Sequence, residues 1–366
     1  MKALHLVRTG RLAWRDCESP QLEGPGEAIV RPLAVARCDL DAEILGGQAP
    51  FRGAALHFLR DRLPERLARG IFRNAPFKGP YAFGHECVAE VVEVGGDVRS
   101  LQVGQRVIVP FQISCGSCAR CMVGLTASCT SVPALSMYGF GAFGGHQWGG
   151  VAADRVRVPF ADAMLVALPE SVSASAAASA GDNLVDGHRA VAGPLLQRPG
   201  SDVLVVGGGA QSVGLYAAGL ARALGAGQVD YLDHDRGRLA VAERIGARVL
   251  EGPYTMRTRR YPITVDASSD VSGLEKALRA TEPGGICTSV AIYYKPRTPV
   301  PLLAMYGSGV TFVTGRVNAR HELPRALEVL ATARFDAASV TTCLASWDDA
   351  PEAMLDRSAK VVIARD

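Results

Sequence analysis

Four cysteines within fifteen residues are the clearest chemical signal in this sequence. Cys115, Cys118, Cys121 and Cys129 follow the spacing C-x2-C-x2-C-x7-C. A structural Zn²⁺ is held by four ligands in a closed tetrahedron, and short Cys-x-x-Cys steps let one loop wrap the ion. A disulfide cluster is the alternative, but the other five cysteines are scattered and no secretory leader precedes them. The spacing therefore predicts a structural zinc lobe at about residues 112–130.

A second set of side chains with metal-ligand chemistry lies outside this lobe. Cys38 stands in Cys38-Asp-Leu-Asp, His85 in Gly-His85-Glu, and Asp182 in Ala-Gly-Asp182-Asn. Taken singly, each residue is more often structural than a ligand. Their meaning depends on what else the chain contains.

A glycine-rich stretch suggests a nucleotide site. The apolar run 203–206 leads into Gly207-Gly-Gly209-Ala-Gln-Ser212-Val213-Gly214, which opens a helix. Glycines there permit a tight turn and let the backbone approach a pyrophosphate, whose charge the amides at the helix N-terminus favour. The motif is imperfect. Read from Gly209, its middle glycine is Gln211, and read from Gly207, Gly214 comes too late. We therefore expect pyrophosphate geometry that deviates from the usual.

The next expected strand ends at Asp233, within the span of about 20 residues at which such folds place a carboxylate on the adenosine ribose. A carboxylate there repels a 2′-phosphate and so favours NAD over NADP. Asp233 could equally be an ordinary helix N-cap, since Asp235 and Arg236 follow at a helix start.

The segments that must position these residues show two different secondary-structure patterns. Residues 1–45 and 84–112 show short Val, Ile and Leu runs broken by Gly and Pro, as β-rich segments do. From about residue 200, strands and helices alternate, which predicts a doubly wound parallel sheet and an α/β fold class. The expected strands are 203–206, 229–232, 263–265, 286–292 and 361–363, and the expected helices are 213–224, 237–245 and 273–280.

Composition narrows the classes of function. The 366 residues are 48% hydrophobic and 20% charged, with a net charge of +3, so no bulk charge points to nucleic acid. No apolar run is long enough to span a bilayer, and the first residues alternate like a strand rather than a signal peptide. We expect a cytoplasmic protein with no nucleic-acid or membrane partner.

Taken together, the chain resembles the zinc-dependent alcohol dehydrogenase branch of the medium-chain dehydrogenase/reductase superfamily along almost its whole length. The cysteine lobe, Gly84-His85-Glu86 and the 207–214 loop carry the resemblance. It implies a GroES-like catalytic domain formed by 1–183 and 317–366, and a Rossmann domain over 184–316.

The resemblance also implies a role for individual residues. A catalytic Zn²⁺ would be held by Cys38, His85 and Asp182, the third as in formaldehyde-dehydrogenase-like members, with the fourth position open. Glu86 matches the family glutamate that can approach the metal during exchange. Asp41 matches a carboxylate that orients the zinc histidine. Lys360 stands where relatives place a basic residue near the pyrophosphate.

The function so implied is an NAD-dependent dehydrogenase with two Zn²⁺ per chain, which interconverts an alcohol (primary, secondary or polyol) and its aldehyde or ketone by hydride transfer. A carbonyl or activated-alkene reductase and a non-catalytic nucleotide-binding protein are the alternatives. The expected partners are a small alcohol or carbonyl substrate and further copies of the chain, as a homodimer or homotetramer.

Several positions depart from the family pattern. Leu40 replaces the usual Ser or Thr that begins a proton relay, and Glu43 stands where a relay histidine is common. The proton must then leave through water, the cofactor ribose or another side chain. Asp39 would weaken cofactor binding unless Arg37 or Lys360 neutralises it.

A basic insert separates Cys38 from His85. Residues 51–80 contain seven Arg or Lys against two acids, and leucines recur at three- and four-residue steps, which predicts a helical hairpin. The insert is either a solvated decoration or oligomer contact, or a lid whose arginines select an anionic substrate.

Overall fold

The computed structural model describes residues 1–47, 77, 79–141, 148–295 and 297–365. Two compact units emerge. The first comprises Met1–Asp182, Asn318–Leu327 and Cys343–Asp366, and the second comprises Asn183–Val317 and Glu328–Thr342. The domains expected from the sequence differ from these units at residues 183 and 317 and over residues 328–342, which belong to the second unit. There, the ring of Phe335 lies against Gly219 and edge-on to Tyr216 at a centroid distance of 6.4 Å.

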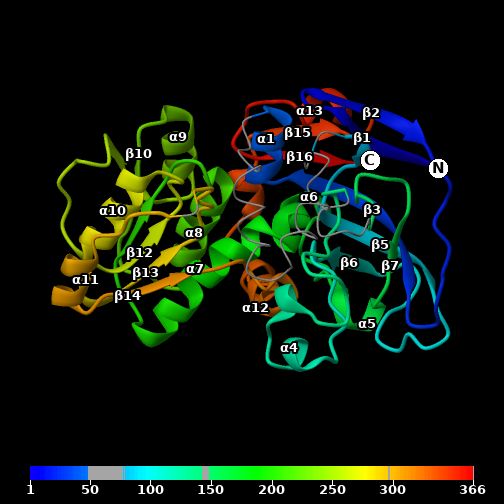
Figure 1. Cartoon of the computed structure of the whole chain (residues 1–366), viewed down its shortest axis with the longest axis horizontal. Coiled ribbons are helices and arrows are strands. Elements are labelled where there is room, and N and C mark those ends of the chain that lie inside the picture. The colour runs from blue at the N-terminus through cyan, green and yellow to red at the C-terminus, as the bar shows by residue number, and fades with distance from the viewer. Residues whose placement is uncertain (48–76, 78, 142–147, 296, 366) are drawn as a thin grey trace. The chain divides into compact units, whose positions relative to one another are not determined.

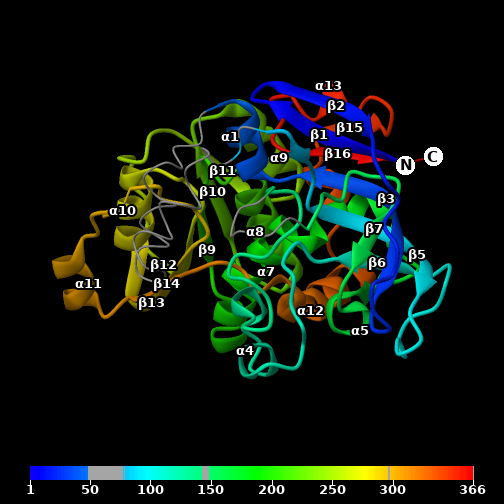
Figure 2. The ribbon, with the colours of Figure 1, turned by 45° about the vertical axis from the view of Figure 1, so that its right-hand side comes forward.

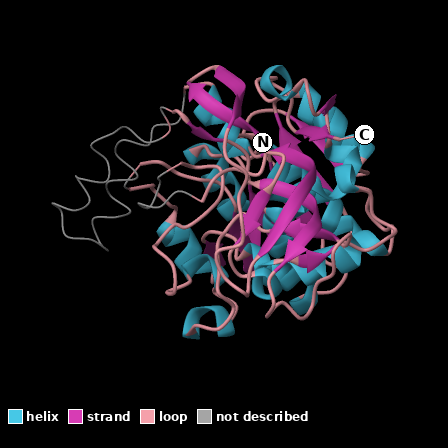
Figure 3. Cartoon of the chain, turned by 90° about the vertical axis from the view of Figure 1, so that its right-hand side faces the viewer, coloured by secondary structure: helices cyan, strands magenta, loops and turns pink. Residues whose placement is uncertain are grey.

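The first unit is built on β-sheets, as expected for a GroES-like domain (Figure 1, Figure 3). Its larger sheet has the order β15-β16-β3-β5-β6-β8, with β7 also paired to β3. A smaller sheet has the order β2-β1-β4. The strands are β1 (Lys2–Arg8), β2 (Arg11–Asp16), β3 (Ala28–Arg37), β4 (Tyr81–Ala82), β5 (Glu86–Val94), β6 (Arg106–Val109), β7 (Val156–Val158), β8 (Val166–Ala167), β15 (Cys343–Ser346) and β16 (Val361–Ala364).

Short helices fill the connections of this unit, and they hold several of the candidate site residues. They are α1 (Asp39–Leu45), α4 (Ala119–Met122), η1 (Thr126–Ser128), α5 (Ala161–Met164), α6 (Ala174–Ala177), η3 (Ala178–Gly181) and α13 (Ala350–Ala353).

Small side chains bring the central strands close to the helical turn that carries Asp182. Ala34 and Ala36 on β3 pack with Ala178 on η3 and Val362 on β16 in one buried cluster. A Cβ on Gly181 would lie 2.6 Å from the carbonyl oxygen of Val109, so that position accepts only glycine without a shift. As a result, β3, β5 and η3 meet at one point. Each of the three elements has a candidate metal ligand at or directly beside the end that lies there. Figure 1 and Figure 2 both show β3 and β5 side by side.

The second unit is the doubly wound α/β sheet that the sequence predicts. Its six strands in the described residues are all parallel, in the order β11-β10-β9-β12-β13-β14. Helices α7 and α8 cover one face and α10 the other, as Figure 1 shows. The strands are β9 (Val203–Val206), β10 (Val229–Asp233), β11 (Arg248–Glu251), β12 (Tyr261–Asp266), β13 (Thr281–Ser289) and β14 (Thr311–Thr314). The helices are α7 (Asn183–Gln197), α8 (Gln211–Ala223), α9 (Arg236–Arg244), α10 (Val271–Ala280), α11 (Leu302–Ser308) and η4 (Ala337–Val340), and α12 (Ala319–Ala331) runs through both units.

Most of the predicted elements of this unit are present. The strand expected at 286–292 was placed too late, because β13 begins at Thr281 and ends at Ser289. Pro283, Gly284 and Gly285 hid its start. The last expected strand residues, 290–292, lie in a loop that leads to Tyr293, whose hydroxyl donates to Asp266 at 2.8 Å. Helix α8 starts two residues earlier than expected, directly after the glycine-rich turn.

Two further findings concern the sequence-based expectations. None of the described helices is long and apolar enough to cross a membrane. The predicted helical hairpin at 51–80 falls almost entirely outside the residues that the structure describes.

Candidate active site

The structure brings the second set of metal-ligand residues together. One ligand atom from each of Cys38, His85, Glu86 and Asp182 lies within 4.8 Å of the others. The first three side chains are buried, and Asp182 is half-buried. Cys38 directly follows β3, His85 directly precedes β5, Glu86 is the first residue of β5, and Asp182 caps the end of η3. Three neighbouring elements thus supply the cluster.

Cys38 is fixed by the start of helix α1. It is the N-cap residue, and its sulfur accepts from the Asp41 amide at 3.3 Å. In return the Asp41 carboxylate accepts from the Cys38 amide at 3.3 Å, which completes a capping box. Burial raises the pKa of the Cys38 thiol well above its usual value. A buried thiol of this kind needs a cation beside it to ionise.

His85 lies between two carboxylates. Its Nδ1 is 3.5 Å from Asp41 Oδ2, and its Nε2 is 3.3 Å from Asp182 Oδ2. Burial alone would lower the pKa of His85, but Asp41 and Asp182 outweigh it and raise the pKa to about 9. The ring also packs against Phe140 at a centroid distance of 4.6 Å. Nδ1 makes no hydrogen bond within the described residues, so Asp41 acts on it as a nearby charge, on the side where a carboxylate commonly supports a zinc histidine that presents Nε2 to the metal.

Glu86 points to a different set of partners from the other three. Its Oε2 accepts from the Ser179 hydroxyl at 2.6 Å and from Lys360 Nζ at 3.0 Å. Burial raises the pKa of Glu86 to about 7, and Lys360 opposes that rise. Glu86 is therefore hydrogen-bonded to Ser179 and Lys360 on one side, and it also lies close to the ligand cluster.

Lys360, which the sequence predicts near a cofactor pyrophosphate, is paired with Glu86 in this structure. Its side chain is fully buried, and Nζ donates to Glu86 and to the carbonyl oxygen of Arg37, the latter at 2.9 Å. The cause is strand pairing, because Val361 stands opposite Arg37 and the lysine just before it is drawn into the first unit. Sequence reasoning missed Ser179, which no local motif marks.

The departures from the family pattern lie on or beside α1. Leu40, Asp39 and Glu43 are all half-buried, so Glu43 is less exposed than a solvated surface carboxylate would be. Arg37 is buried and donates to the carbonyl oxygens of Met354 at 3.1 Å and Ser358 at 2.6 Å. Its guanidinium is thus engaged with the main chain.

The four lobe cysteines also converge. Their sulfur atoms lie within 4.8 Å of one another, which suits a closed tetrahedral set. Hydrogen bonds from the main-chain amide and the side chain of Thr130 lower the pKa of Cys118 to about 5. Burial instead raises the pKa of Cys121 to about 12, so that thiol needs a cation beside it to ionise.

The lobe is anchored to the start of helix α12. The Ala127 amide donates to Asn318 Oδ1 at 2.9 Å. A Cβ on Gly124 would come within 2.8 Å of the His321 ring, so the lobe lies directly on this helix.

The glycine-rich loop is tightly confined in the second unit. A Cβ on Gly207 would lie 2.5 Å from Asp233 Oδ2, and one on Gly208 would lie 2.6 Å from the Tyr254 hydroxyl. The Tyr254 hydroxyl donates to the Gly207 carbonyl at 2.8 Å. The helix begins at Gln211, so the turn uses Gly207 and Gly209. Ser212 stands where the third glycine would be if the motif is read from Gly207. It is buried and donates to Asn183 at 2.9 Å.

Asp233 has the place expected of it, at the end of β10 beside the loop. Its carboxylate accepts from Arg238 at 2.7 and 2.8 Å and from the amides of His234 and Asp235. The N-cap of α9 is Asp235, which excludes the alternative that Asp233 itself caps that helix. Sequence reasoning missed Arg238, although its position at the second residue of the predicted helix, five residues after Asp233, was a usable signal.

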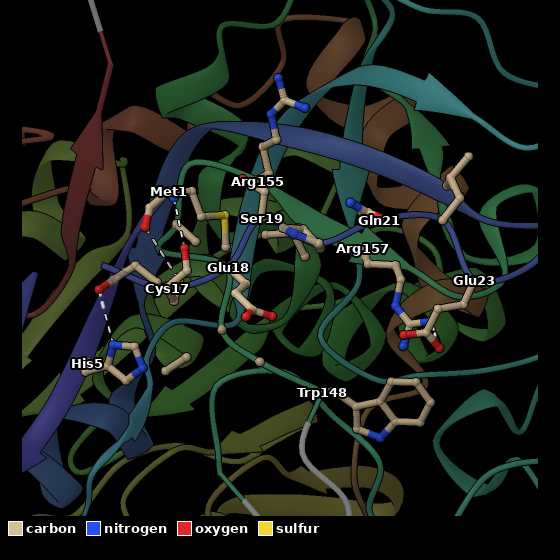
Figure 4. Close-up of a pocket in the computed structure, with 18 residues that line it drawn as sticks. Met1, His5, Cys17, Glu18, Ser19, Gln21, Glu23, Trp148, Arg155 and Arg157 are labelled. Carbon is tan, nitrogen blue, oxygen red and sulfur yellow. Dashed lines mark hydrogen bonds and ion pairs between the residues drawn. The ribbon is translucent and has the colours of Figure 1, made fainter. Parts of the chain in front are cut away.

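A separate cavity of about 870 Å³ lies in the first unit (Figure 4). Its lining includes Met1, Cys17, Glu18, Trp148 and Arg155, and none of the metal-ligand residues described above. The amino group of Met1 donates to the Cys17 carbonyl across one end of it at 2.9 Å. The cavity is thus distinct from the candidate active site.

Comparisons with known proteins agree with this geometry. A model of the alcohol dehydrogenase GroES-like domain matches residues 24–170. A probable zinc-binding alcohol dehydrogenase of Mycobacterium tuberculosis is 29% identical over 360 residues, which cover 96% of this chain and 83% of that protein.

One further relative is similar to a part of this chain, and one solved structure is similar to the whole fold. A glutathione-independent formaldehyde dehydrogenase of Pseudomonas aeruginosa is 39% identical over 176 residues, 46% of this chain and 43% of that protein. The solved structure of an alcohol dehydrogenase from Thermus sp. ATN1 superposes with a TM-score of 0.83 at 27% identity and covers both chains completely.

Proposed function

Since this chain belongs to the zinc-dependent alcohol dehydrogenase branch of the medium-chain dehydrogenase/reductase superfamily, we propose that it is a zinc- and NAD-dependent dehydrogenase. It would interconvert an alcohol and its aldehyde or ketone by hydride transfer. The observation that carries the proposal is the buried cluster of Cys38, His85 and Asp182, with Asp41 behind the histidine.

The donor atoms fit a catalytic Zn²⁺. A thiolate, an imidazole and a carboxylate are ligands that zinc accepts, and three of them leave a position for the substrate oxygen. The fit has an independent sign in His85, whose Nδ1 faces Asp41 while Nε2 faces the ligand cluster. When bound, Zn²⁺ supplies Lewis-acid polarisation of the substrate oxygen, and NAD supplies the hydride acceptor. A second Zn²⁺, with a structural role, would fill the four-cysteine lobe.

The protein's own residues would orient and enclose the reacting group. Asp41 keeps the His85 ring in place, and Phe140 and Phe111 pack against that ring at 4.6 and 5.6 Å. Such apolar walls exclude water and suit the carbon skeleton of a small alcohol. Leu40 offers no hydroxyl, so the alcohol proton would leave through water or the cofactor ribose.

The second unit supports NAD rather than NADP. Asp233 ends β10 beside the glycine-rich loop, the position from which a carboxylate of this fold accepts from ribose hydroxyls and repels a 2′-phosphate, although here its side chain is 0% exposed and paired with Arg238. Arg238 neutralises part of that charge, and its side chain is 13% exposed. We therefore expect a preference for NAD that is measurable without being absolute.

The chain also offers a surface for association with further copies of itself. β14 is an edge strand, and the adjacent α11 exposes Leu302, Leu303 and Tyr306 at 68%, 85% and 86%. Antiparallel pairing of two β14 edges would extend the sheet and cover these side chains. We propose a homodimer, or a homotetramer built from such dimers.

The state of the cysteines is the basis for a proposed location in the cell. All nine are free thiols in the structure. That state suits a reducing compartment, and we propose the cytoplasm.

The test is an oxidation assay on a panel of primary, secondary and polyol alcohols with NAD or NADP, in wild type and Asp182→Asn. The proposal predicts NAD-linked turnover that the variant loses. A carbonyl or alkene reductase would show turnover only in the reducing direction. A nucleotide-binding protein would bind NADH and turn over none of the substrates, and this outcome would overturn the proposal.

A further inference from the structure

Glu86 has two competing attachments in this structure. On one side lies the ligand cluster, whose donor atoms from Cys38, His85 and Asp182 are within 4.8 Å of a Glu86 oxygen. On the other side, Ser179 and Lys360 both donate to Oε2, at 2.6 and 3.0 Å. Lys360 Nζ also lies 3.3 Å from Oε1, so both oxygens of Glu86 are engaged on this side, and a metal at the cluster would compete with these bonds for the carboxylate.

The partners of Glu86 are firmly placed. Ser179, Glu86 and Lys360 are at most 1% exposed. Ser179 sits on η3, three residues before Asp182, and Lys360 precedes β16, whose Val361 pairs with Arg37 of β3. Lys360 Nζ also donates to the Arg37 carbonyl at 2.9 Å, so its ammonium is held from two directions.

We propose that Ser179 and Lys360 are positioning residues that hold Glu86 off the catalytic metal and so keep its fourth coordination position open. This inference rests on the proposed function, because it presupposes a metal on Cys38, His85 and Asp182. Ser179 has no place in the resemblance from which the ligands were assigned, and its role comes from its hydrogen bond alone.

The physical reason lies in the cost of releasing the carboxylate. A hydrogen bond to a charged group contributes about 1.5–3 kcal/mol, equivalent to a factor of about ten to a hundred in an equilibrium. Without the Ser179 hydroxyl, Oε2 loses its shorter bond, and a dication within reach becomes the stronger partner. Glu86 would then close the site with a fourth protein ligand, as in structural zinc sites.

The experiment uses Co²⁺-substituted protein, whose visible bands report coordination, and imidazole as the probe of the open position. The dissociation constant of imidazole is measured by absorption titration for wild type, Ser179→Ala and Ser179→Thr. Ser179→Thr keeps the hydroxyl. Ser136→Ala is the matched control, because Ser136 is a buried serine whose hydroxyl donates to the Pro133 carbonyl at 2.8 Å. Circular dichroism and thermal melting confirm that each variant is folded.

The proposal predicts that imidazole binds at least about tenfold more weakly to Ser179→Ala than to wild type. Ser179→Thr and Ser136→Ala should stay near the wild-type value. Adding Glu86→Gln to Ser179→Ala should restore imidazole binding, because the neutral amide is a poor zinc-site competitor. Lys360→Met should weaken imidazole binding in the same way as Ser179→Ala.

Two results would overturn the inference: an imidazole constant for Ser179→Ala within twofold of wild type, or a weakened constant that Glu86→Gln does not restore. A different failure would belong to the proposed function. If wild-type protein shows no Co²⁺ band that Asp182→Ala abolishes, the metal centre itself is wrong. If that band is present and only the Ser179 effect is missing, the proposed function stands and Glu86 is not held back by Ser179.

Discussion

Replacing Asp41 by Asn tests how the protein tunes its proposed catalytic metal. The Asp41 carboxylate lies 3.5 Å from His85 Nδ1, and both side chains are 1% exposed, so little solvent screens the pair. Carboxylates that orient a zinc histidine typically contribute 10- to 100-fold in metal affinity. We therefore expect Asp41→Asn to weaken the catalytic site by about 1.4–2.8 kcal/mol.

The same substitution should leave helix α1 intact. Asparagine retains a side-chain oxygen that can accept from the Cys38 amide, as Asp41 does at 3.3 Å. Asp41→Ala removes this acceptor as well, and should cost about 1 kcal/mol of stability in addition. The pair of variants thus separates the charge beside His85 from the cap.

The assay is competition with a chelator of known zinc affinity, with zinc retained per chain measured at each chelator concentration. Asp39→Asn is the matched control, because it removes a carboxylate from the same first turn of α1. Asp41→Asn should release one zinc at 10- to 100-fold lower chelator strength, while the lobe zinc is unaffected. Equal release from wild type and Asp41→Asn, or equal weakening by Asp39→Asn, would refute the reasoning.

Four further predictions rest on the same geometry. Burial lowers the pKa of His85, but neighbouring carboxylates outweigh it and raise the pKa from 6.5 to about 9, so protons compete with the metal. Zinc affinity should rise with pH through this range and, because the buried Cys38 thiol must also lose its proton, beyond it. The stability of the metal-free protein should depend on pH in the opposite direction. The stability contributed by protonated His85 is complete below about pH 6.5 and is lost as pH rises through 9. Thermal melts at several pH values would show this loss, and a melting temperature that does not change with pH would contradict it. Gly208→Ala should weaken NADH binding in a fluorescence titration without loss of zinc, since its Cβ would meet the Tyr254 hydroxyl; unchanged binding would mean that the loop can shift. Cys121→Ser should lose one zinc and lower the melting temperature, because structural zinc binding is linked to folding, and an unchanged melt would argue against a structural lobe.

Local spacing made much of the site predictable. The lobe cysteines lie within fifteen residues, so their convergence follows from a single loop. The expected strand at 203–206 and the glycine-rich turn after it appear as expected, because a buried run of Val and Leu ending in glycines has few alternatives. Only the family resemblance predicted that Cys38, His85 and Asp182 lie together. The structure supplies the distances between them.

Long-range partners were beyond the reach of the sequence. Ser179 and Lys360 meet at Glu86 from positions 93 and 274 residues away, and no local pattern records that meeting. Helix α7 escaped notice because Gly187 and Pro194 lower its helix propensity. Packing explains the glycine: a Cβ on Gly187 would lie 2.8 Å from the Ala217 amide of α8, so close helix crossing requires it.

The most direct test of the central claim is zinc content per chain in wild type and Asp182→Ala, by elemental analysis side by side. The account predicts two zincs in wild type and about one in the variant, because Asp182 holds the catalytic ion and the cysteine lobe keeps its own. One zinc in both proteins would contradict it. Only the lobe would then bind metal, and the buried cluster around His85 would need another explanation.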